Sequence, residues 1–562
     1  MTDLTGEITV KPEIMFLEDL LRGLASGNLR VPKFQRPFVW RPDQMLELFD
    51  SIERGYSIGS LLVWDTNQDL PSLERIAGIE IPSVPQRGGV SYLLDGHQRL
   101  CTLFGSLSRR QHADAGAGQQ EWMWNIYRAL GGRAEPGSRY RHWKKAEEPS
   151  PDYLPVRAVL RTMDFLTYGR RLSVAAQDRT DDLNSLMDEA EQVAQRIKSY
   201  KIAVVRLVGG ELSHAVEVFS RLNSSGQSMT PEQMVSALTY QADGSDILTD
   251  RIKYVQESLG EVGYGTIPST TIFRSILAVM GEEDVKRTRW AMLAERVKGR
   301  LAVAMDETDR ALRCVVEFLR SEVGVPLARL IPYNDQVVLL VAFFNLKAEP
   351  SRQQTETLVR WFWSTSWSGF FAGANTTQIK HALQEMRNFA KGDGELSFVG
   401  QVARPFPNRF DLRSARIRAF ILWDLREFSA RNDLAGKVID GVGLLARSDT
   451  AAYRHVVTTK GLSSISSPGN RLILSTPFGV SLRQALLDLP PEQEGILESH
   501  GIPQRALSCL RDGDEEGFIK ERAVYLADRE RVFITGMGVE LSSEILGEAD
   551  IDADMVFPES RE

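Results

Sequence analysis

The chain has 562 residues, of which 43% are hydrophobic and 25% charged, and its formal net charge at pH 7 is −8. This length exceeds what a single hydrophobic core usually supports, so we expect roughly two to four domains. The composition is ordinary for a soluble globular protein. The acidic balance argues against a protein that coats DNA nonspecifically, although it leaves room for a local basic groove.

The sequence carries no signal of a membrane or secreted protein. It has no run of about 18 apolar residues that would span a bilayer. Its first residues lack the basic region and apolar stretch of a secretory signal. Cys101, Cys314 and Cys509 lie too far apart to form a CxxC metal knuckle or to suggest a disulfide framework. We therefore expect a location in the reducing cytoplasm.

The first region, about residues 1–240, mixes short strands with helices. Residues 42–54 have apolar side chains at helical spacing and a proline in the first turn, which predicts a helix. The short apolar runs at 59–64 and 201–208 are typical of buried strands. Residues 133–152 are rich in proline, glycine and charge and show no apolar period, so we expect an inserted loop there.

The second region, about residues 241–430, has the pattern of a helical domain. Long amphipathic stretches lie at 335–344, 356–367 and 413–428. Trp361, Trp363 and Trp367 are spaced two and four residues apart, which favours packing in a helical core. The last region, about residues 431–562, returns to a mixed pattern, with a strand expected at 470–475.

The sharpest signal for chemistry is YLLDGHQRL at residues 92–100. An apolar strand runs into an Asp95-Gly96 turn, which opens a segment with helical periodicity. Backbone N–H groups at a helix N-terminus favour anions such as phosphate, and a glycine allows close approach of the backbone. Arg99 can pair with phosphate oxygens, and Asp95 can orient water or hold a metal ion. The alternative is an ordinary turn with a capping aspartate and a surface arginine.

Two further segments join this one. In FQRPFVW, residues 34–40, Arg36 is suited to contact phosphate and Gln35 to bond a base or sugar; the alternative is an extended segment whose aromatic side chains anchor it to the core. In FSRLNSSG, residues 219–226, a helix ends at the asparagine and glycine. Arg221 and Asn223 are the members of that segment with polar groups left for a ligand.

Together these segments resemble the N-terminal domain of the GmrSD family of modification-dependent restriction proteins, in the ParB/sulfiredoxin-like superfamily. The family pattern runs FQR-x-[YF]-x-W, SI-x-RG-[YF]-x-IGS, DGQQRL and F-x-RLN-xx-G. This chain supplies FQRPFVW, SIERGYSIGS, DGHQRLCTL and FSRLNSSG in that order. The resemblance covers roughly residues 12–240, with a weaker similarity at 360–375.

The resemblance implies an α+β fold with three parts. We expect a ParB/sulfiredoxin-like N-terminal domain over residues 1–240 and an all-helical middle domain over 241–430. A small mixed α/β domain would follow over 431–562.

In this family the DGQQR motif is associated with nucleotide binding and hydrolysis. Carried over residue by residue, the catalytic positions are Asp95, His97, Gln98 and Arg99. The nucleotide-binding positions are Gln35, Arg36, Gly96, Arg221 and Asn223. The departure is His97, which replaces the first glutamine; imidazole still donates a hydrogen bond and titrates near neutral pH. The resemblance implies a nucleoside triphosphate as substrate and Mg²⁺ as cofactor, whereas the sequence leaves open which side chains would bind a metal.

A basic segment within 133–152 combines cations with an aromatic side chain, which suits contact with the DNA backbone and stacking on a base. The residues are Arg139, Arg141, Trp143, Lys144 and Lys145. The alternative is a solvated insertion.

Many members of the family end in an HNH-type nuclease domain, which needs a general-base histidine, an orienting asparagine and metal ligands. The spacing of His455 and Asn470 fits that pattern. Arg454, however, stands where a metal ligand is expected, and nothing in 477–482 binds metal. We therefore expect a degenerate HNH-like remnant in the C-terminal domain.

These observations predict a DNA-directed nucleotide hydrolase of a prokaryotic anti-phage restriction system. Its expected partners are a nucleotide, DNA that is foreign or modified, and either other proteins of the defence system or further copies of itself, with no membrane. One alternative is a non-enzymatic module that binds modified DNA or a partner protein. Another is an HNH-type nickase or endonuclease.

Overall fold

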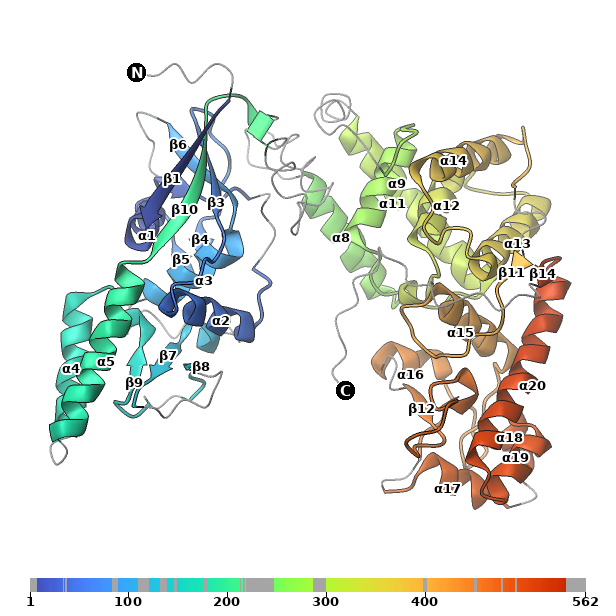
Figure 1. Ribbon diagram of the computed structural model, residues 1–562. Coiled ribbons are helices and arrows are strands. Elements are labelled where there is room, and N and C mark those ends of the chain that lie inside the picture. The colour runs from blue at the N-terminus through green and yellow to red at the C-terminus, as the bar shows by residue number, and fades with distance from the viewer. Residues whose placement is uncertain are drawn as a thin grey trace. The chain divides into compact units, whose positions relative to one another are not determined.

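The computed structural model describes residues 8–33, 35, 38–82, 89–109, 121–131, 139–145, 149–175, 180–212, 214–215, 218, 247–286, 300–397, 402–448, 452–476, 479–490 and 493–541. The chain forms two compact units, Met1–Ile247 and Leu248–Glu562 (Figure 1). The predicted helical and C-terminal domains both lie in the second unit. No described helix is long and apolar enough to cross a membrane.

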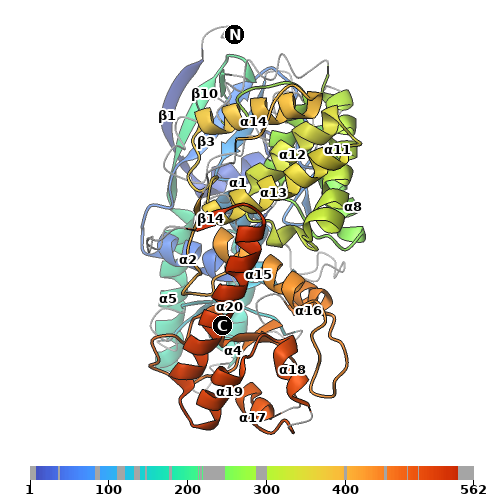
Figure 2. The same ribbon diagram turned by 90° about the vertical axis from the view of Figure 1, so that its right-hand side faces the viewer.

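A mixed five-stranded sheet forms the centre of the first unit. Its order is β1 (Thr9–Phe16), β10 (Lys201–Val208), β3 (Leu61–Thr66), β6 (Val90–Asp95) and β2 (Leu29–Arg30). The β1–β10 and β3–β6 pairs are antiparallel, and the β10–β3 and β6–β2 pairs are parallel. Figure 2 shows β1, β10 and β3 side by side. The strands predicted at 59–64 and 201–208 are therefore confirmed, the first of them beginning at Leu61.

The core of the first unit lies between this sheet and its helices. Alternate residues of the strands enter it, such as Leu61 and Val63 of β3 and Ile202 and Val204 of β10. The helices that contribute to this core are α1 (Leu17–Ala25), α2 (Pro42–Glu53), α3 (His97–Leu107), α4 (Thr162–Ala175) and α5 (Thr180–Lys198). The helix predicted at 42–54 is confirmed as α2. Its proline occupies a first-turn position, where a missing N–H group costs nothing.

A second, three-stranded sheet has the order β8 (Tyr140–His142), β7 (Ile126–Ala129) and β9 (Tyr153–Pro155). The prediction of one loop over 133–152 is therefore wrong, because β8 lies within that span and pairs antiparallel with β7. Burial of Tyr140, whose ring lies 5.7 Å from that of Phe49, stabilises this strand despite the polar residues around it. The other short elements of this unit are β4 (Arg75–Ile76), β5 (Ile79–Glu80), η1 (Glu121–Trp124) and η2 (Val156–Ala158).

The first part of the second unit is helical, as predicted. Its helices are α8 (Ile247–Glu261), α9 (Ser269–Val279), α11 (Leu301–Phe318), η3 (Leu319–Val323), η4 (Ala328–Leu330), α12 (Asn334–Leu346), α13 (Arg352–Ser368), α14 (Thr376–Lys391) and α15 (Ala415–Glu427). The expectation that Trp361, Trp363 and Trp367 belong to a helical core is confirmed, since all three are buried. The rings of Trp363 and Trp367 stack at 4.8 Å.

The rest of the second unit mixes short strands with helices. Its elements are β11 (Val402–Ala403), α16 (Gly441–Ser448), β12 (Tyr453–His455), η6 (Pro468–Asn470), β13 (Arg471–Ile473), α17 (Leu482–Leu487), α18 (Glu494–Ser499), α19 (Gln504–Arg511), α20 (Glu515–Gly536) and β14 (Glu540–Leu541). The predicted strand at 470–475 is confirmed as the shorter β13. Helix α20 extends into the helical part, where Phe533 packs edge-on against Trp363 and Trp367.

Two buried arginines of the second unit fasten segments that are distant in sequence. Arg416 of α15 makes a bidentate ion pair with Glu530 of α20 at 2.8 and 2.7 Å, with side-chain exposures of 5% and 1%. Arg522 of α20 donates to five backbone carbonyl groups at 2.9 to 3.3 Å, those of Pro468, Gly469, Arg471, His500 and Gly501. Helix α20 therefore joins the helical part, the β12–β13 hairpin and the α18–α19 turn.

Replacing Glu530 with alanine would leave the guanidinium group of Arg416 buried without its counter-charge. We expect the Glu530→Ala variant to lose about 3–5 kcal/mol in the free energy of unfolding, measured by urea denaturation. The matched control is Glu257→Ala, which removes an ion pair between Glu257, 63% exposed, and Lys253, 71% exposed. This control should lose less than about 1 kcal/mol in the free energy of unfolding. Equal losses in the two variants would contradict a stabilising role for the buried pair.

Candidate functional site

The predicted strand, turn and helix around Asp95 are present in the structure. Strand β6 ends at Asp95, Gly96 has φ +95°, and α3 begins at His97. A Cβ atom on Gly96 would lie 2.1 Å from a methyl carbon of Leu61. Both the left-handed backbone and the lack of space therefore require glycine at this corner.

Arg99 lies in the first turn of α3. Its side chain links the turn at Asp95 and Gly96, which we call the Asp95 corner, to the segment at Ile58 and Gly59. Its Nη1 donates to the carbonyl of Ile58 at 2.7 Å, and its Nη2 pairs with Oδ2 of Asp95 at 3.1 Å. A Cβ atom on Gly59 would lie 2.4 Å from Nη1 of Arg99, so the guanidinium group rests directly on the glycine backbone. The side chains of Arg99 and Asp95 remain 18% and 35% exposed. A guanidinium group has five N–H donors, so Arg99 can bind an anion in addition to these contacts.

Two glutamines fasten the segment around residues 35–40 to the same corner. Gln98, which is buried, accepts hydrogen bonds from the backbone N–H groups of Val39 at 2.8 Å and Trp40 at 3.3 Å. Gln35 donates to the carbonyl of Leu94 at 2.8 Å. These bonds give both glutamines a positioning role. Contact of either side chain with a nucleotide stays a prediction.

The aromatic residues of this segment anchor it, as one of the two sequence readings expected. Phe38 lies 5.0 Å from Trp124, ring centre to ring centre, and both Phe38 and Trp40 pack against the core. His97 is buried at the start of α3. Phe34, Arg36, Arg221 and Asn223 lie outside the described residues. The nucleotide contacts expected of Arg36, Arg221 and Asn223 therefore stay predictions.

Residues 17–240 match the family model of the GmrSD restriction endonuclease N-terminal domain. The match identifies this part of the first unit as a GmrSD N-terminal domain, called the GmrSD domain below, and supports a restriction-related protein that acts on DNA. An uncharacterised protein of Methanocaldococcus jannaschii is also similar, with 20% identity over 428 residues that cover 68% of this chain and 69% of the relative.

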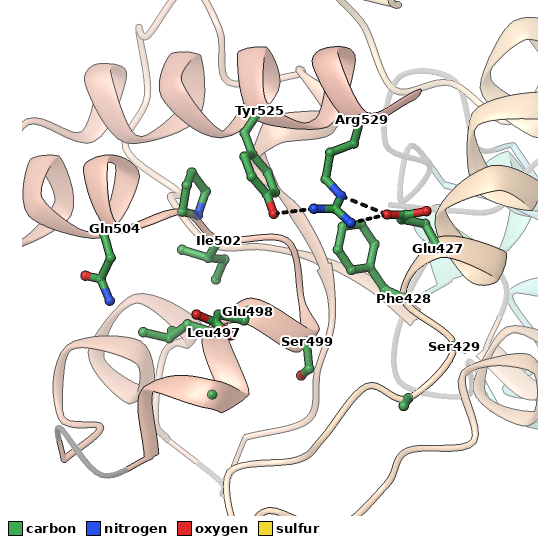
Figure 3. Close-up of a pocket in the computed structure, with 13 residues that line it drawn as sticks. Glu427, Phe428, Ser429, Leu497, Glu498, Ser499, Ile502, Gln504, Tyr525 and Arg529 are labelled. Atoms are coloured by element: carbon green, nitrogen blue, oxygen red, sulfur yellow. Dashed lines mark hydrogen bonds and ion pairs between the residues drawn. The ribbon is translucent and has the colours of Figure 1, made fainter. Parts of the chain in front are cut away.

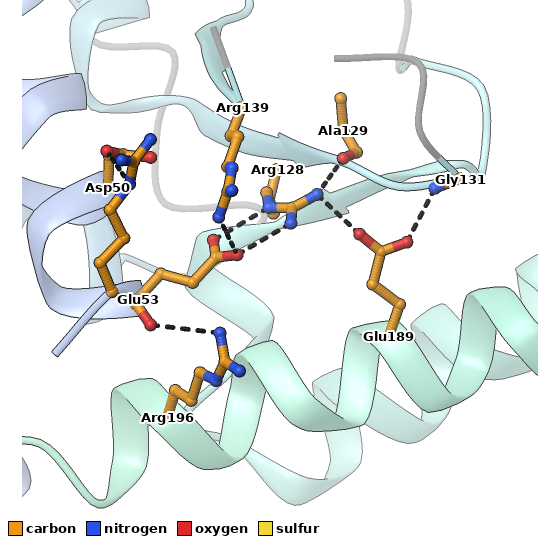
Figure 4. Close-up of polar contacts among 9 residues, drawn as sticks. Asp50, Glu53, Arg128, Ala129, Gly131, Arg139, Glu189 and Arg196 are labelled. Atoms are coloured by element: carbon orange, nitrogen blue, oxygen red, sulfur yellow. Dashed lines mark hydrogen bonds and ion pairs between the residues drawn. The ribbon is translucent and has the colours of Figure 1, made fainter. Parts of the chain in front are cut away.

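The GmrSD domain contains a buried charge cluster that the sequence reading missed (Figure 4). Glu53, from the SIERG motif at the end of α2, accepts two hydrogen bonds from Arg128 of β7 at 2.9 and 2.8 Å. Burial acts to raise the pKa of Glu53, but the hydrogen bonds from Arg128 and the charges of Arg128 and Arg139 outweigh it and hold the pKa below its ordinary value. The sequence did contain a signal for this cluster, which is the glutamate of SIERGYSIGS. An acidic side chain at the end of the apolar face of a helix is buried with that face, and a buried carboxylate needs a partner.

The segment predicted to contact DNA lies on β8 and the residues after it. Lys144 and Lys145 are exposed, and each ammonium group lies over an indole ring, at 4.1 Å for Trp122 and 5.9 Å for Trp143. Trp143 packs against Tyr127 and Tyr153. Arg141 is half-buried on β8, where it pairs with Tyr127 of β7.

Among the described residues, no group of three or more histidine, cysteine, aspartate or glutamate side chains could hold a metal ion. Mg²⁺ commonly binds through one or two carboxylates together with substrate phosphates and water. The single exposed carboxylate of Asp95 fits that second arrangement, in which the nucleotide would bring most of the ligands.

The predicted nuclease remnant has a clear structural role at one of its two positions. Asn470 is fully buried; its amide accepts from Val457 N at 2.8 Å and donates to the carbonyls of Val457 and Ile465 at 2.9 Å. It therefore braces the loop between β12 and β13. His455 ends β12 opposite Arg471. A nuclease function of this pair stays a prediction.

The second unit also has a cavity of about 700 Å³ beside α18 and α20 (Figure 3). Arg529 projects into it but is neutralised by Glu427, whose carboxylate accepts from Nε at 2.7 Å. Glu498 adds a further negative charge, and Tyr525 accepts from Arg529 at 3.2 Å. This lining disfavours a triphosphate.

Substitution of Gly96 tests whether this corner requires glycine. The Gly96→Ala variant should lose more than about 2 kcal/mol in the free energy of unfolding, because it combines a strained φ with a clash against Leu61. Gly55 is the matched control, since it has φ +73° but nothing within 4 Å of an added Cβ atom. Gly55→Ala should cost only about 1 kcal/mol. Similar urea midpoints for the two variants would exclude a special requirement at Gly96.

His500 predicts a pH dependence of stability. Burial lowers its pKa to about 4, and its Nε2 lies 2.7 Å from the carbonyl of Asn432. The unfolded chain binds the proton more readily than the folded chain. The stability that neutral His500 contributes is therefore fully present above about pH 6.5 and is lost as the pH falls towards 4. We expect about 3 kcal/mol of destabilisation across that window, measured by urea unfolding at each pH. The loss should be absent from His500→Gln and retained in the control His381→Gln, whose imidazole is 74% exposed.

Proposed function

We propose that the Asp95 corner binds a nucleoside triphosphate, with Mg²⁺, and hydrolyses it when the protein engages foreign or modified DNA. One observation carries this proposal: the guanidinium group of Arg99 is fixed by Ile58 and Asp95 next to the N-terminus of α3. A fixed cation at a helix N-terminus is suited to hold a transferring phosphoryl group without reorganisation during the reaction.

The start of α3 supports the binding of anions. The first N–H groups of a helix have no partner within the helix, and here the N-cap is glycine, which has no side chain to satisfy them. The first turn of α3 contains no acidic residue that would compete with a phosphate. The partial positive charge of the helix end then adds to the charge of Arg99.

Asp95 and its neighbours would complete the chemistry. One carboxylate oxygen of Asp95 pairs with Arg99, and the carboxylate can also contact Mg²⁺ or orient the attacking water. Mg²⁺ would neutralise charge on the phosphates. Gln98 and Gln35 would keep Gln35, Val39 and Trp40 against the corner. Arg36 remains a proposed contact to the phosphates. His97 takes the place of the family's first glutamine.

Recognition of DNA would take place on the basic segment 139–145, which contains β8. The exposed ammonium groups of Lys144 and Lys145, each beside an indole ring, suit contact with phosphates and stacking of a base. Arg139, Arg141 and Trp143 belong to the same segment. Arg221 and Asn223 remain proposed contacts to the nucleotide.

Replacement of Arg99 tests the proposed hydrolysis. We expect Arg99→Gln to reduce phosphate release by about 100-fold or more, assayed with each nucleoside triphosphate in the presence and absence of DNA. Arg109→Gln is the matched control, because Arg109 follows the far end of α3 and also donates to a backbone carbonyl, that of Ala77, at 2.9 Å. Its activity should stay close to that of the unmodified protein.

Thermal unfolding of both variants would show that the fold persists. Normal phosphate release by folded Arg99→Gln would overturn the site assignment. Absence of phosphate release from the unmodified protein with every nucleotide and DNA would instead identify the first unit as a binding module.

A further inference from the structure

A cationic hollow lies in the GmrSD domain, at the C-terminal end of α2. It has a volume of about 360 Å³, near the lower end of the roughly 300–1,000 Å³ that small-ligand sites occupy. Its polar lining comes from α2, β7, the residue before β8 and α5, and consists of Glu53, Arg128, Arg139, Glu189, Gln192 and Arg196. Figure 4 shows all of these except Gln192. Three arginines therefore face two glutamates.

Arg128 alone engages both carboxylates. It donates to the two oxygens of Glu53 at 2.9 and 2.8 Å and to Glu189 at 2.9 Å. The second oxygen of Glu189 accepts from the backbone N–H of Gly131 at 2.8 Å. The two acids are thus used to hold Arg128 and the turn after β7.

Arg128 alone leaves the two glutamates one positive charge short, and Arg139 and Arg196 together bring the net charge of the lining to +1. The Nη1 atom of Arg139 lies 3.4 Å from the Glu53 oxygen that Arg128 already binds. The Nη1 atom of Arg196 lies 3.4 Å from the backbone carbonyl of Glu53. Both contacts are long for hydrogen bonds, and both arginine side chains are accessible to solvent. The two guanidinium groups converge on one residue from opposite sides of the hollow, as Figure 4 shows.

We infer that this hollow binds a phosphate group, held between Arg139 and Arg196. Each guanidinium group can offer two parallel N–H donors to a phosphate, and both groups can turn from their long contacts without breaking the Arg128 pairs. The amide of Gln192 lies one turn before Arg196 on α5 and supplies a further donor.

This site is separate from the Asp95 corner and does not depend on hydrolysis there. None of the residues that line the hollow takes part in the contacts of Arg99 with Ile58 and Asp95. The phosphate could belong to a DNA backbone or to a free nucleotide, and the two sources predict different binding results.

Calorimetric titration with inorganic pyrophosphate tests the site. All proteins would carry Arg99→Gln, which weakens binding at the Asp95 corner and isolates the hollow. We expect Arg139→Gln/Arg196→Gln to reduce the affinity for pyrophosphate about tenfold or more. The charge-retaining Arg139→Lys/Arg196→Lys variant should recover part of the loss. The control Arg170→Gln, which removes an exposed arginine of α4, should change nothing.

Fluorescence anisotropy with a 20-base-pair duplex distinguishes the two sources. The single variant Arg196→Gln is used here, because Arg196 lies on α5 and outside the proposed DNA-binding segment. If the phosphate belongs to DNA, this variant should also weaken duplex binding, and the slope of log affinity against log salt should fall by about 1. If it belongs to a free nucleotide, Arg196→Gln should change only pyrophosphate binding. Equal pyrophosphate and duplex affinities in the double variant and the Arg170 control would overturn the inference, with thermal unfolding confirming that every variant is folded.

Discussion

The guanidinium group of Arg99, held between the Ile58 carbonyl and the Asp95 carboxylate, is the contact on which the site of the GmrSD domain depends. It joins the strand that follows Gly59 to the helix that follows Gly96. Each of these glycines has a positive φ, and each leaves no room for a Cβ atom. The segments around Gly59 and Gly96 are therefore in direct contact, which explains why each of these positions excludes a side chain larger than hydrogen.

Much of this arrangement could be predicted from local pattern. The strand, turn and helix around Asp95 and the helix that begins at Pro42 follow from periodicity and turn chemistry, which act over a few residues. The contacts of Gln98 could not be predicted in the same way, because its partners are backbone groups 58 and 59 positions earlier in the chain. A glutamine that holds backbone and one that holds a ligand look identical in sequence.

The short strand β8 is a case in which local composition indicated the wrong structure. Proline, glycine and charge around residues 133–152 indicated a loop, yet Tyr140 is buried against Phe49 and its neighbours pair with β7. Tertiary contact overrode local propensity there. The ion pair of Glu53 and Arg128 likewise depends on residues 75 positions apart. The shared face of Trp363 and Trp367 was predictable, because they are four residues apart on a helix. Trp361 lies on the other side of α13, and its burial depends on tertiary packing there.

The hydrogen-bond partners of Arg522 are backbone carbonyl groups, and this affects which substitutions the surrounding turns can accept. Its charge is surrounded by peptide carbonyls of two separate turns, so that the backbone solvates the cation much as water would. Every residue type carries a carbonyl group. The acceptors therefore do not depend on side-chain identity. Gly469 and Gly501, however, leave no room for a Cβ atom, so steric space and not acceptor chemistry restricts substitution in those turns.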